Sequence, residues 1–287
     1  MDEPHSADRR IVALMRISTW NLLHGISLSG NAPGEVTADG LAQASLLGCD
    51  VLAIQEVDCN QIRSNHVHQT LEIARATGLN HWCYAPAITG TPGEEWAAAT
   101  DVHLHHHTDA PVETTPRYGN ALLSRFPMSN IEILRFAPSR FSMPLLVPGT
   151  PRPQIMKVAD EPRVAILAEL DTPHGVIHVA TAHLSFIPGT NVRQLKALAK
   201  ALKKRAGSNP AFLIGDFNLP GRIPTRVASL PSLARCATYP TPNPKIQFDH
   251  ILAQGLSIEQ IEIARASAQN VALEISDHRA LTIDVWN

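Results

Sequence analysis

The 287-residue sequence lacks any excess of positive charge. Lys and Arg together number 24 and Asp and Glu 26, which gives a formal net charge of −2. Proteins that bind bulk nucleic acid without sequence preference usually present a basic face, because neutralisation of phosphates drives that binding. The charge balance therefore argues against a protein that binds duplexes nonspecifically. Nucleic acid is still a possible partner if the fold forms a local basic groove.

Cysteines and long apolar runs are also scarce. None of the four cysteines lies in the C-x-x-C spacing of a zinc or redox site, so we expect buried free thiols. No segment approaches the roughly 18 apolar residues of a membrane span. The apolar run at 11–15 is shorter than the core of a signal peptide. These features predict a cytoplasmic protein with no membrane span, and we expect a monomer.

The composition is that of a folded chain, with 44% hydrophobic and 17% charged residues. The polar start, MDEPHSADRR, predicts a disordered N-terminal extension over residues 1–15. No internal repeat or linker divides the remainder, so residues 16–287 are expected to form a single domain.

Short apolar runs bounded by Gly, Pro, Asn or Asp predict buried strands. These runs are 17–21, 51–57, 121–124, 164–170, 176–183, 211–215, 248–253 and 280–285. Helices are expected at 38–47, 70–77 and 191–206, the last with Leu195, Leu198 and Leu202 on one face and Gly207 at its end. Many strands and few helices predict a layered α/β sandwich.

Two long stretches, 85–116 and 137–162, are rich in turn-forming residues and are expected to be irregular. The first contains His103, His105, His106 and His107. Such a cluster could bind a transition metal, but a solvated loop near an active-site mouth is the simpler interpretation.

Six apolar segments end in polar residues of the same chemical kind. Three segments end in a single such residue, namely Asn21, Glu56 or His183. The other three end in a pair, namely Asp216 with Asn218, Asp249 with His250, and Asp277 with His278. Strand ends that carry one kind of chemistry are expected to converge on one site. Carboxylate and amide oxygens without Cys ligands favour Mg²⁺ or Mn²⁺, and histidines beside carboxylates supply acid–base groups. This pattern predicts metal-assisted hydrolysis of a phosphoester.

Seven motifs occur in an order that resembles the endonuclease/exonuclease/phosphatase superfamily, from about Arg16 to Val285. They are T-W-N-L-L-H-G (19–25), I-Q-E-V (54–57), Y-G-N-A-L-L-S-R (118–125), T-A-H-L (181–184), G-D-F-N (215–218), F-D-H-I (248–251) and S-D-H (276–278). The resemblance implies an α/β (α+β), DNase I-like fold. This is a four-layered sandwich in which two mixed β-sheets pack face to face and helices flank them.

The resemblance also implies a metal site. Glu56 matches the family's principal metal ligand, and Asn21 is placed beside it as a ligand or a phosphate contact. Asp277 matches a carboxylate that contributes to the same site.

Catalytic roles follow from the same resemblance. Asp216 and Asn218 match the pair that positions the attacking water and polarises the phosphate. His183 matches a histidine that contacts the phosphate and is expected to protonate the leaving group. Asp249 matches the carboxylate that orients His278 as a base or phosphate ligand.

Two further residues are expected to bind substrate. Asn120 is a weaker match to a phosphate contact, and Arg163 is expected either to contact the substrate phosphate or to form an exposed salt bridge. His24 and His250, next to motif residues, are expected to pack behind the site.

The implied function is that of a Mg²⁺- or Mn²⁺-dependent phosphoesterase. Its substrate is left open among nucleic acid, phospholipid headgroup and small phosphoesters. The sequence departs from well-known family members at Leu22–Leu23–His24 and in the 85–116 stretch, so their substrates do not transfer. The alternative is a catalytically silent binding module on the same fold.

Overall fold

The computed structural model describes residues 14–28, 34–100, 103–105, 114–147 and 154–286. The predicted N-terminal extension falls almost wholly on residues 1–13, which lie outside the described residues. Met15, which was assigned to that extension, is instead the first residue of strand β1 (Met15–Asn21), where it is buried and pairs with Val285.

The larger sheet is mixed. Its strands run in the order β14-β15-β1-β2-β6-β3-β4, and β5 pairs with β3. Only β1 and β2 are parallel neighbours, and the other pairs are antiparallel. The further strands are β2 (Val51–Cys59), β3 (His81–Gly90), β4 (Trp96–Ala98), β5 (Leu104–His105), β6 (Arg117–Ser124), β14 (Gln269–Val271) and β15 (Ala280–Val285).

The second sheet runs β13-β12-β11-β10-β7 and is mixed as well, with β11 and β12 parallel. Its strands are β7 (Met128–Phe136), β10 (Arg163–Thr172), β11 (Gly175–His183), β12 (Ala211–Asp216) and β13 (Asp249–Gln254). Two parallel pairs, one in each sheet, carry four of the segments that end in predicted site residues.

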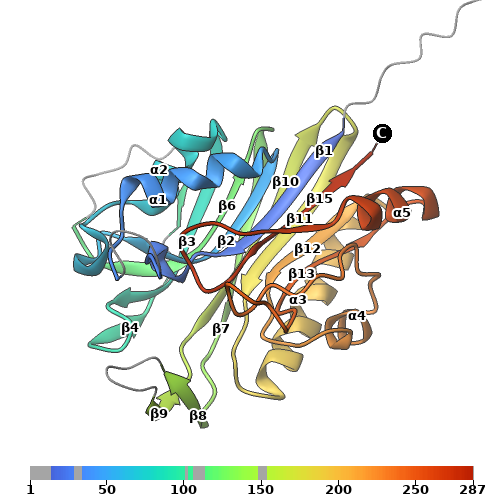
Figure 1. The fold of residues 1–287 in the computed structure, drawn as a ribbon. Coiled ribbons are helices and arrows are strands. Elements are labelled where there is room, and N and C mark those ends of the chain that lie inside the picture. Colours follow the sequence, from blue (N-terminus) through green and yellow to red (C-terminus); the bar gives the residue numbers. More distant parts are fainter. Residues whose placement is uncertain (1–13, 29–33, 101–102, 106–113, 148–153, 287) are drawn as a thin grey trace, which may run out of the picture.

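The helices and the two sheets form four layers (Figure 1). Three apolar cores lie between these layers. Along β2, Val51 and Ala53 face the core between the sheets, whereas Leu52 and Ile54 face the core beneath the helices. The helices on that side are α1 (Ala38–Ala42), the 3₁₀ turn η2 (Gln43–Leu47) and α2 (Gln69–Thr77). This alternation is what a strand buried on both faces requires.

The second sheet is covered by α3 (Thr190–Ala206) and α4 (Ile223–Ala228), with Leu195, Leu198 and Leu202 forming the apolar stripe of α3. The remaining helices are α5 (Ile258–Ser267), which packs along β15, and the 3₁₀ turns η1 (Leu23–Gly25) and η3 (Ile62–Ser64). The predicted sandwich of two mixed sheets with flanking helices is confirmed. In the described part of the chain, no helix has the length and apolarity needed to cross a membrane.

The two stretches expected to be irregular contain strands instead. β3 continues to Gly90 past a register shift between Pro86 and Ile88, and β4 and β5 pair with it. In the second stretch, β8 (Ser142–Val147) and β9 (Gln154–Ala159) form a separate two-stranded hairpin. Proline is compatible with strands at bulges and edges, which is why proline content alone misassigned both stretches. Of the histidine cluster, His103 precedes β5 and His105 lies in it, whereas His106 and His107 lie outside the described residues.

Other elements were missed because they lack an apolar run. β7 is an edge strand with the sequence MSNIEILRF, in which exposed polar residues interrupt the apolar ones. β14, α4 and α5 are short or only weakly amphipathic. Cys49, Cys59 and Cys83 are buried free thiols as predicted, and Cys236 is a half-buried one.

Gly215 brings two functional strand ends close together. It pairs with Ala182 between β12 and β11, one residue before Asp216 and His183. A Cβ at Gly215 would lie 2.2 Å from the Ala182 carbonyl oxygen, and its φ of 138° is also unfavourable for other residues. Only glycine permits this spacing of the two strands.

We therefore expect Gly215→Ala to lower the free energy of unfolding by about 1–3 kcal/mol or more, since overpacking and backbone strain add. Gly78→Ala is the matched control, because Gly78 at the end of α2 has a left-handed φ of 71° and open space around its missing Cβ. That control should cost about 1 kcal/mol. Urea unfolding of both variants measures the difference, and equal losses would contradict the steric account.

Candidate active site

The predicted strand ends meet at one cavity of about 930 Å³ between the two sheets. Eight of the ten predicted site residues line it, namely Asn21, Glu56, Arg163, His183, Asp216, Asn218, Asp277 and His278. Asp249 lies directly behind His278, and Asn120 does not line the cavity. The arrangement gathers residues from β1, β2, β10, β11 and β12 and from the loop before β15.

Asn21 connects two carboxylates from opposite sheets. Its Nδ2 donates to Glu56 Oε1 at 2.9 Å and to Asp216 Oδ2 at 3.0 Å. Its Oδ1 accepts the backbone N–H of Leu23 at 3.0 Å, which fixes the orientation of the amide. Asn21 therefore positions both carboxylates in the cavity.

Glu56 reaches the cavity because β2 is bulged. The pairing with β6 shifts register between Ile54 and Val57, and Glu56 has a φ of 58°. Ile54 and Val57 both remain buried beneath the helices, so the bulge turns only Glu56 away from that core. A non-glycine residue in this region is strained, and such strain gathers at functional sites.

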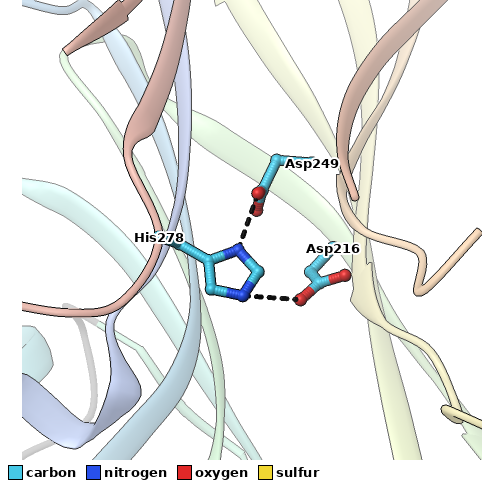
Figure 2. A group of neighbouring side chains, drawn as sticks. All are labelled: Asp216, Asp249 and His278. Carbon is cyan, nitrogen blue, oxygen red and sulfur yellow. Dashed lines mark hydrogen bonds and ion pairs between the residues drawn. The ribbon is translucent and has the colours of Figure 1, made fainter. Parts of the chain in front are cut away.

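Asp249 and His278 form the shortest ion pair in the cavity, with 2.8 Å between Oδ2 and Nδ1. Figure 2 shows the imidazole between Asp249 and Asp216, whose Oδ2 lies 3.9 Å from Nε2. Burial alone would lower the pKa of His278, but the charge and hydrogen bond of Asp249, with Asp216 and Asp277, raise it to about 10. His278 is therefore a cation at neutral pH.

His183 has the opposite protonation state. Burial and the neighbouring Arg163 lower the pKa of His183 to about 3. Both ring nitrogens face donors, with an Arg163 guanidinium nitrogen 3.2 Å from Nδ1 and Asn218 Nδ2 3.0 Å from Nε2. Donor neighbours on both sides disfavour a second ring proton, in agreement with a neutral His183. It is therefore not the imidazolium that protonation of a leaving group would require.

Arg163 does not form the exposed salt bridge that was one of its two expected roles. It is only 6% exposed, and its guanidinium lies 3.8 Å from buried Asp160. Asp160 also accepts hydrogen bonds from the Ser139 backbone and the Ser185 hydroxyl. The fold thus fixes a cation in the cavity wall.

Asn120 has a structural place. Its Nδ2 donates to the Val164 carbonyl at 2.7 Å, which joins β6 of one sheet to β10 of the other. Val164 directly follows Arg163, so Asn120 acts on the cavity through the position of β10 and not from its lining.

Of the two histidines next to motif residues, His250 packs behind the site as expected. His250 is buried, donates from Nε2 to the Leu219 carbonyl at 2.9 Å and stacks on Phe217. His24 does not line the cavity, and burial lowers its pKa to about 3.

Several lining residues were not predicted. Tyr239 packs against His278 with 4.9 Å between ring centroids, and Phe186 lies under the Arg163 guanidinium at 5.9 Å. Glu161 adds a carboxyl group whose pKa is raised by burial. These residues lie in irregular or proline-flanked segments. They do not follow an apolar run, so the sequence pattern that located the other site residues could not indicate them.

The negative groups in the cavity suit a divalent cation. Burial, together with the charges of Glu56 and Asp216, raises the pKa of Asp277 to about 6. Crowded carboxylates of this kind are relieved by a metal ion that oxygen ligands favour. Among the described residues, ligand atoms of Asp216, Asp249 and His278 also lie within 4.8 Å of one another. Two members of this Asp216–Asp249–His278 group already bind each other, because Asp249 and Nδ1 of His278 form the ion pair described above.

The comparison with known families identifies the class to which this fold and cavity belong. The model of the Endonuclease/Exonuclease/phosphatase family matches residues 18–278, so the chain belongs to that family. The search of curated proteins returned no match to this sequence.

Solved structures with the same fold share little sequence with this chain. A family member from Beutenbergia cavernae DSM 12333 is 19% identical, with a TM-score of 0.55 over 95% of this chain and 71% of that one. A mannosyl-6-phosphatase from Bacteroides thetaiotaomicron VPI-5482 is 14% identical, with a TM-score of 0.54 over 95% and 100%. A humanized D. rerio TDP2 is 13% identical, with a TM-score of 0.51 over 96% and 99%.

The contrasting protonation states of His183 and His278 are testable by ¹⁵N NMR of the ring nitrogens in EDTA. At pH 7, both nitrogens of His278 should carry protons, whereas His183 should be neutral. Asp249→Asn should lower the pKa of His278, because it removes the main charge that raises it. Asp39→Asn, at an exposed position on α1, is the control and should leave it unchanged. A neutral His278 in the parent protein would contradict the ion pair.

Proposed function

We propose that this protein is a Mg²⁺- or Mn²⁺-dependent phosphoesterase that hydrolyses a phosphodiester by in-line attack of water. One observation carries the proposal: Asn21, Glu56, His183, Asp216, Asn218 and His278 line a single cavity, with Asp249 paired to His278. Convergence of the complete set from two sheets favours an enzyme over the silent binding module, for which these buried charges would be a cost without a use.

In this proposal Glu56 is the principal metal ligand and Asp277 contributes a second carboxylate. Asn21 supports the site beside them, because its Nδ2 faces Glu56 and Asp216 while its Oδ1 accepts the Leu23 backbone N–H. Their oxygen-rich chemistry and the crowding of negative charge around Asp277 fit a hard divalent ion. The ion, when bound, would supply electrostatic stabilisation of charge developing on phosphate oxygen.

The attacking water is positioned by Asp216 and Asn218. Asp216 is almost fully buried, and its Oδ1 accepts the Asn218 backbone N–H at 2.9 Å, which leaves Oδ2 toward the cavity. Asn218 Nδ2 is held by the Leu184 carbonyl at 2.9 Å and lies 3.0 Å from His183 Nε2. The G-D-F-N turn is thereby rigid, and its φ of 50° at Asn218 is part of that geometry.

The phosphate is bound by the cations of the cavity lining. His278, held protonated by Asp249, and buried Arg163 are both lining cations. Of the two roles expected for His278, base or phosphate ligand, a pKa of about 10 favours the phosphate ligand. Asp249 is then the residue that orients and charges it.

Beyond its phosphodiester group, the natural substrate is left open. Nucleic acid, phospholipid headgroups and small phosphoesters all carry the group that the cavity would bind. The names of the structural neighbours include a sugar phosphatase, which supports the phosphate chemistry of the proposal.

Hydrolysis of bis-p-nitrophenyl phosphate should stop in EDTA and return with Mg²⁺ or Mn²⁺. Glu56→Gln should raise the Mg²⁺ concentration needed for half-maximal rate by at least about tenfold, because a charged ligand is lost, with little change in melting temperature. Glu259→Gln, at an exposed position on α5, is the control. Full activity in excess chelator would overturn the metal assignment.

The Asp249–His278 pair should behave as one unit. His278→Ala should lower kcat by about 10²–10⁴-fold, as for other removed acid–base or charge-stabilising groups, and Asp249→Asn should cause a comparable loss. The double variant should be little worse than either single variant, because the carboxylate acts through the imidazole. Losses that multiply would show that the two residues act independently.

A further inference from the structure

A second cavity, of about 790 Å³, adjoins the active-site cavity. Its lining comes from residues 220–226, which include the start of α4, from residues 231–237 and 245–247, and from Arg265 of α5. The two cavities share Pro220 and Ile246 as lining residues, so these two side chains form the wall between them.

The second cavity is strongly basic. Among the described residues, its lining contains no Asp or Glu and five cations, namely Arg222, Arg226, Arg235, Lys245 and Arg265. All five are exposed residues. This concentration contrasts with the whole chain, in which carboxylates slightly outnumber cations.

These cations are also not neutralised by the protein. Within the described part of the chain, none of the five forms an ion pair, whereas Arg16, Arg63, Arg125 and Arg205 do pair with carboxylates. Arg265 is held in place by donating from Nε to the Ser232 carbonyl at 3.0 Å. Like charges gathered around one hollow repel one another, and an anion relieves that repulsion.

The wall between the cavities is tied to the catalytic groups. The backbone N–H of Ile246 donates to the Tyr239 carbonyl at 2.8 Å, and the Tyr239 ring packs against His278. Gly221 donates to the Gln247 carbonyl at 3.3 Å, which joins the Pro220 side of the wall to the Ile246 side. A ligand across this wall would therefore lie at a fixed position relative to the scissile phosphate.

We propose that this basic cavity is a second phosphate-binding site, which takes a phosphate group of a small phosphorylated molecule. Arginine forks are well suited to phosphate oxygens, and a hollow of this volume admits a small molecule but not a duplex. The phosphate has two sources: a second phosphate on the substrate itself or a separate phosphorylated ligand. The first source rests on the proposed phosphoesterase function, and the second does not.

The first experiment measures binding without turnover. Inorganic tripolyphosphate is titrated into the full-length protein in EDTA by calorimetry. We expect saturable binding that Arg226→Gln/Arg235→Gln weakens at least about tenfold, since two charge-assisted contacts are lost. Lys196→Gln/Lys200→Gln removes the same charge from exposed positions on α3 and should change affinity less than about twofold. If tripolyphosphate does not bind, or if both double variants lose the same affinity, the proposed second phosphate-binding site is wrong.

The second experiment distinguishes the sources. The p-nitrophenyl ester of thymidine 5′-phosphate is compared with its 3′-phosphorylated counterpart, which differs only by the second phosphate. If the substrate spans the wall, kcat/KM should be higher for the bisphosphate, and the Arg226→Gln/Arg235→Gln variant should remove that advantage. If the ligand is separate, the two esters should react alike, while tripolyphosphate binding still depends on the two arginines. If the protein hydrolyses neither ester, the proposed phosphoesterase function is wrong. The calorimetric titration then decides by itself whether the basic cavity binds phosphate.

Discussion

The ion pair between Asp249 and His278 is the constraint on which the site depends. Asp249 stands at the start of β13 in one sheet, and His278 lies just before β15 in the other. Asp249 is fully buried, and its Oδ1 accepts no hydrogen bond from the described residues. Such a pair is expensive to desolvate, so it forms only where packing fixes both partners. The central core between the sheets supplies that rigidity.

The cavity lining carries groups of both charges. Glu56, Asp216 and Asp277 are its acidic groups at the proposed metal site, and Arg163 and His278 are its cations. Asn21 bridges two of the carboxylates through its amide nitrogen. A metal ion is complementary to the acidic groups and a phosphate to the cations, which is the physical basis of the proposed hydrolysis. The basic cavity beyond Pro220 and Ile246 adds further cations next to this cavity.

Much of this arrangement could be predicted from the sequence because it is local. An apolar run that ends in Asp216 or His183 indicates both the strand and the group at its end, and ordered motifs indicate the fold. Burial could not be predicted in the same way. Arg163 follows Glu161–Pro162, and nothing in that local sequence indicates that its side chain is buried. Asn120 lies in a motif that suggested a phosphate contact, but its amide instead joins the two sheets. The opposite protonation states of His183 and His278 depend on neighbours far away in the chain.

The same distinction applies to the secondary structure. Strands with continuous apolar runs were located, whereas β3 beyond Pro86 and the β8–β9 hairpin are strands because of pairing partners. The basic cavity is likewise formed by residues from four segments, none of which is a basic run.

The central claim is the position of the metal, and anomalous scattering from a crystal soaked in Mn²⁺ tests it most directly. The account predicts a peak coordinated by Glu56 and Asp277, with the Asp249–His278 ion pair intact. A peak bound instead by Asp216, Asp249 and His278 would contradict it, because that arrangement would turn the proposed phosphate-binding cation into a metal ligand.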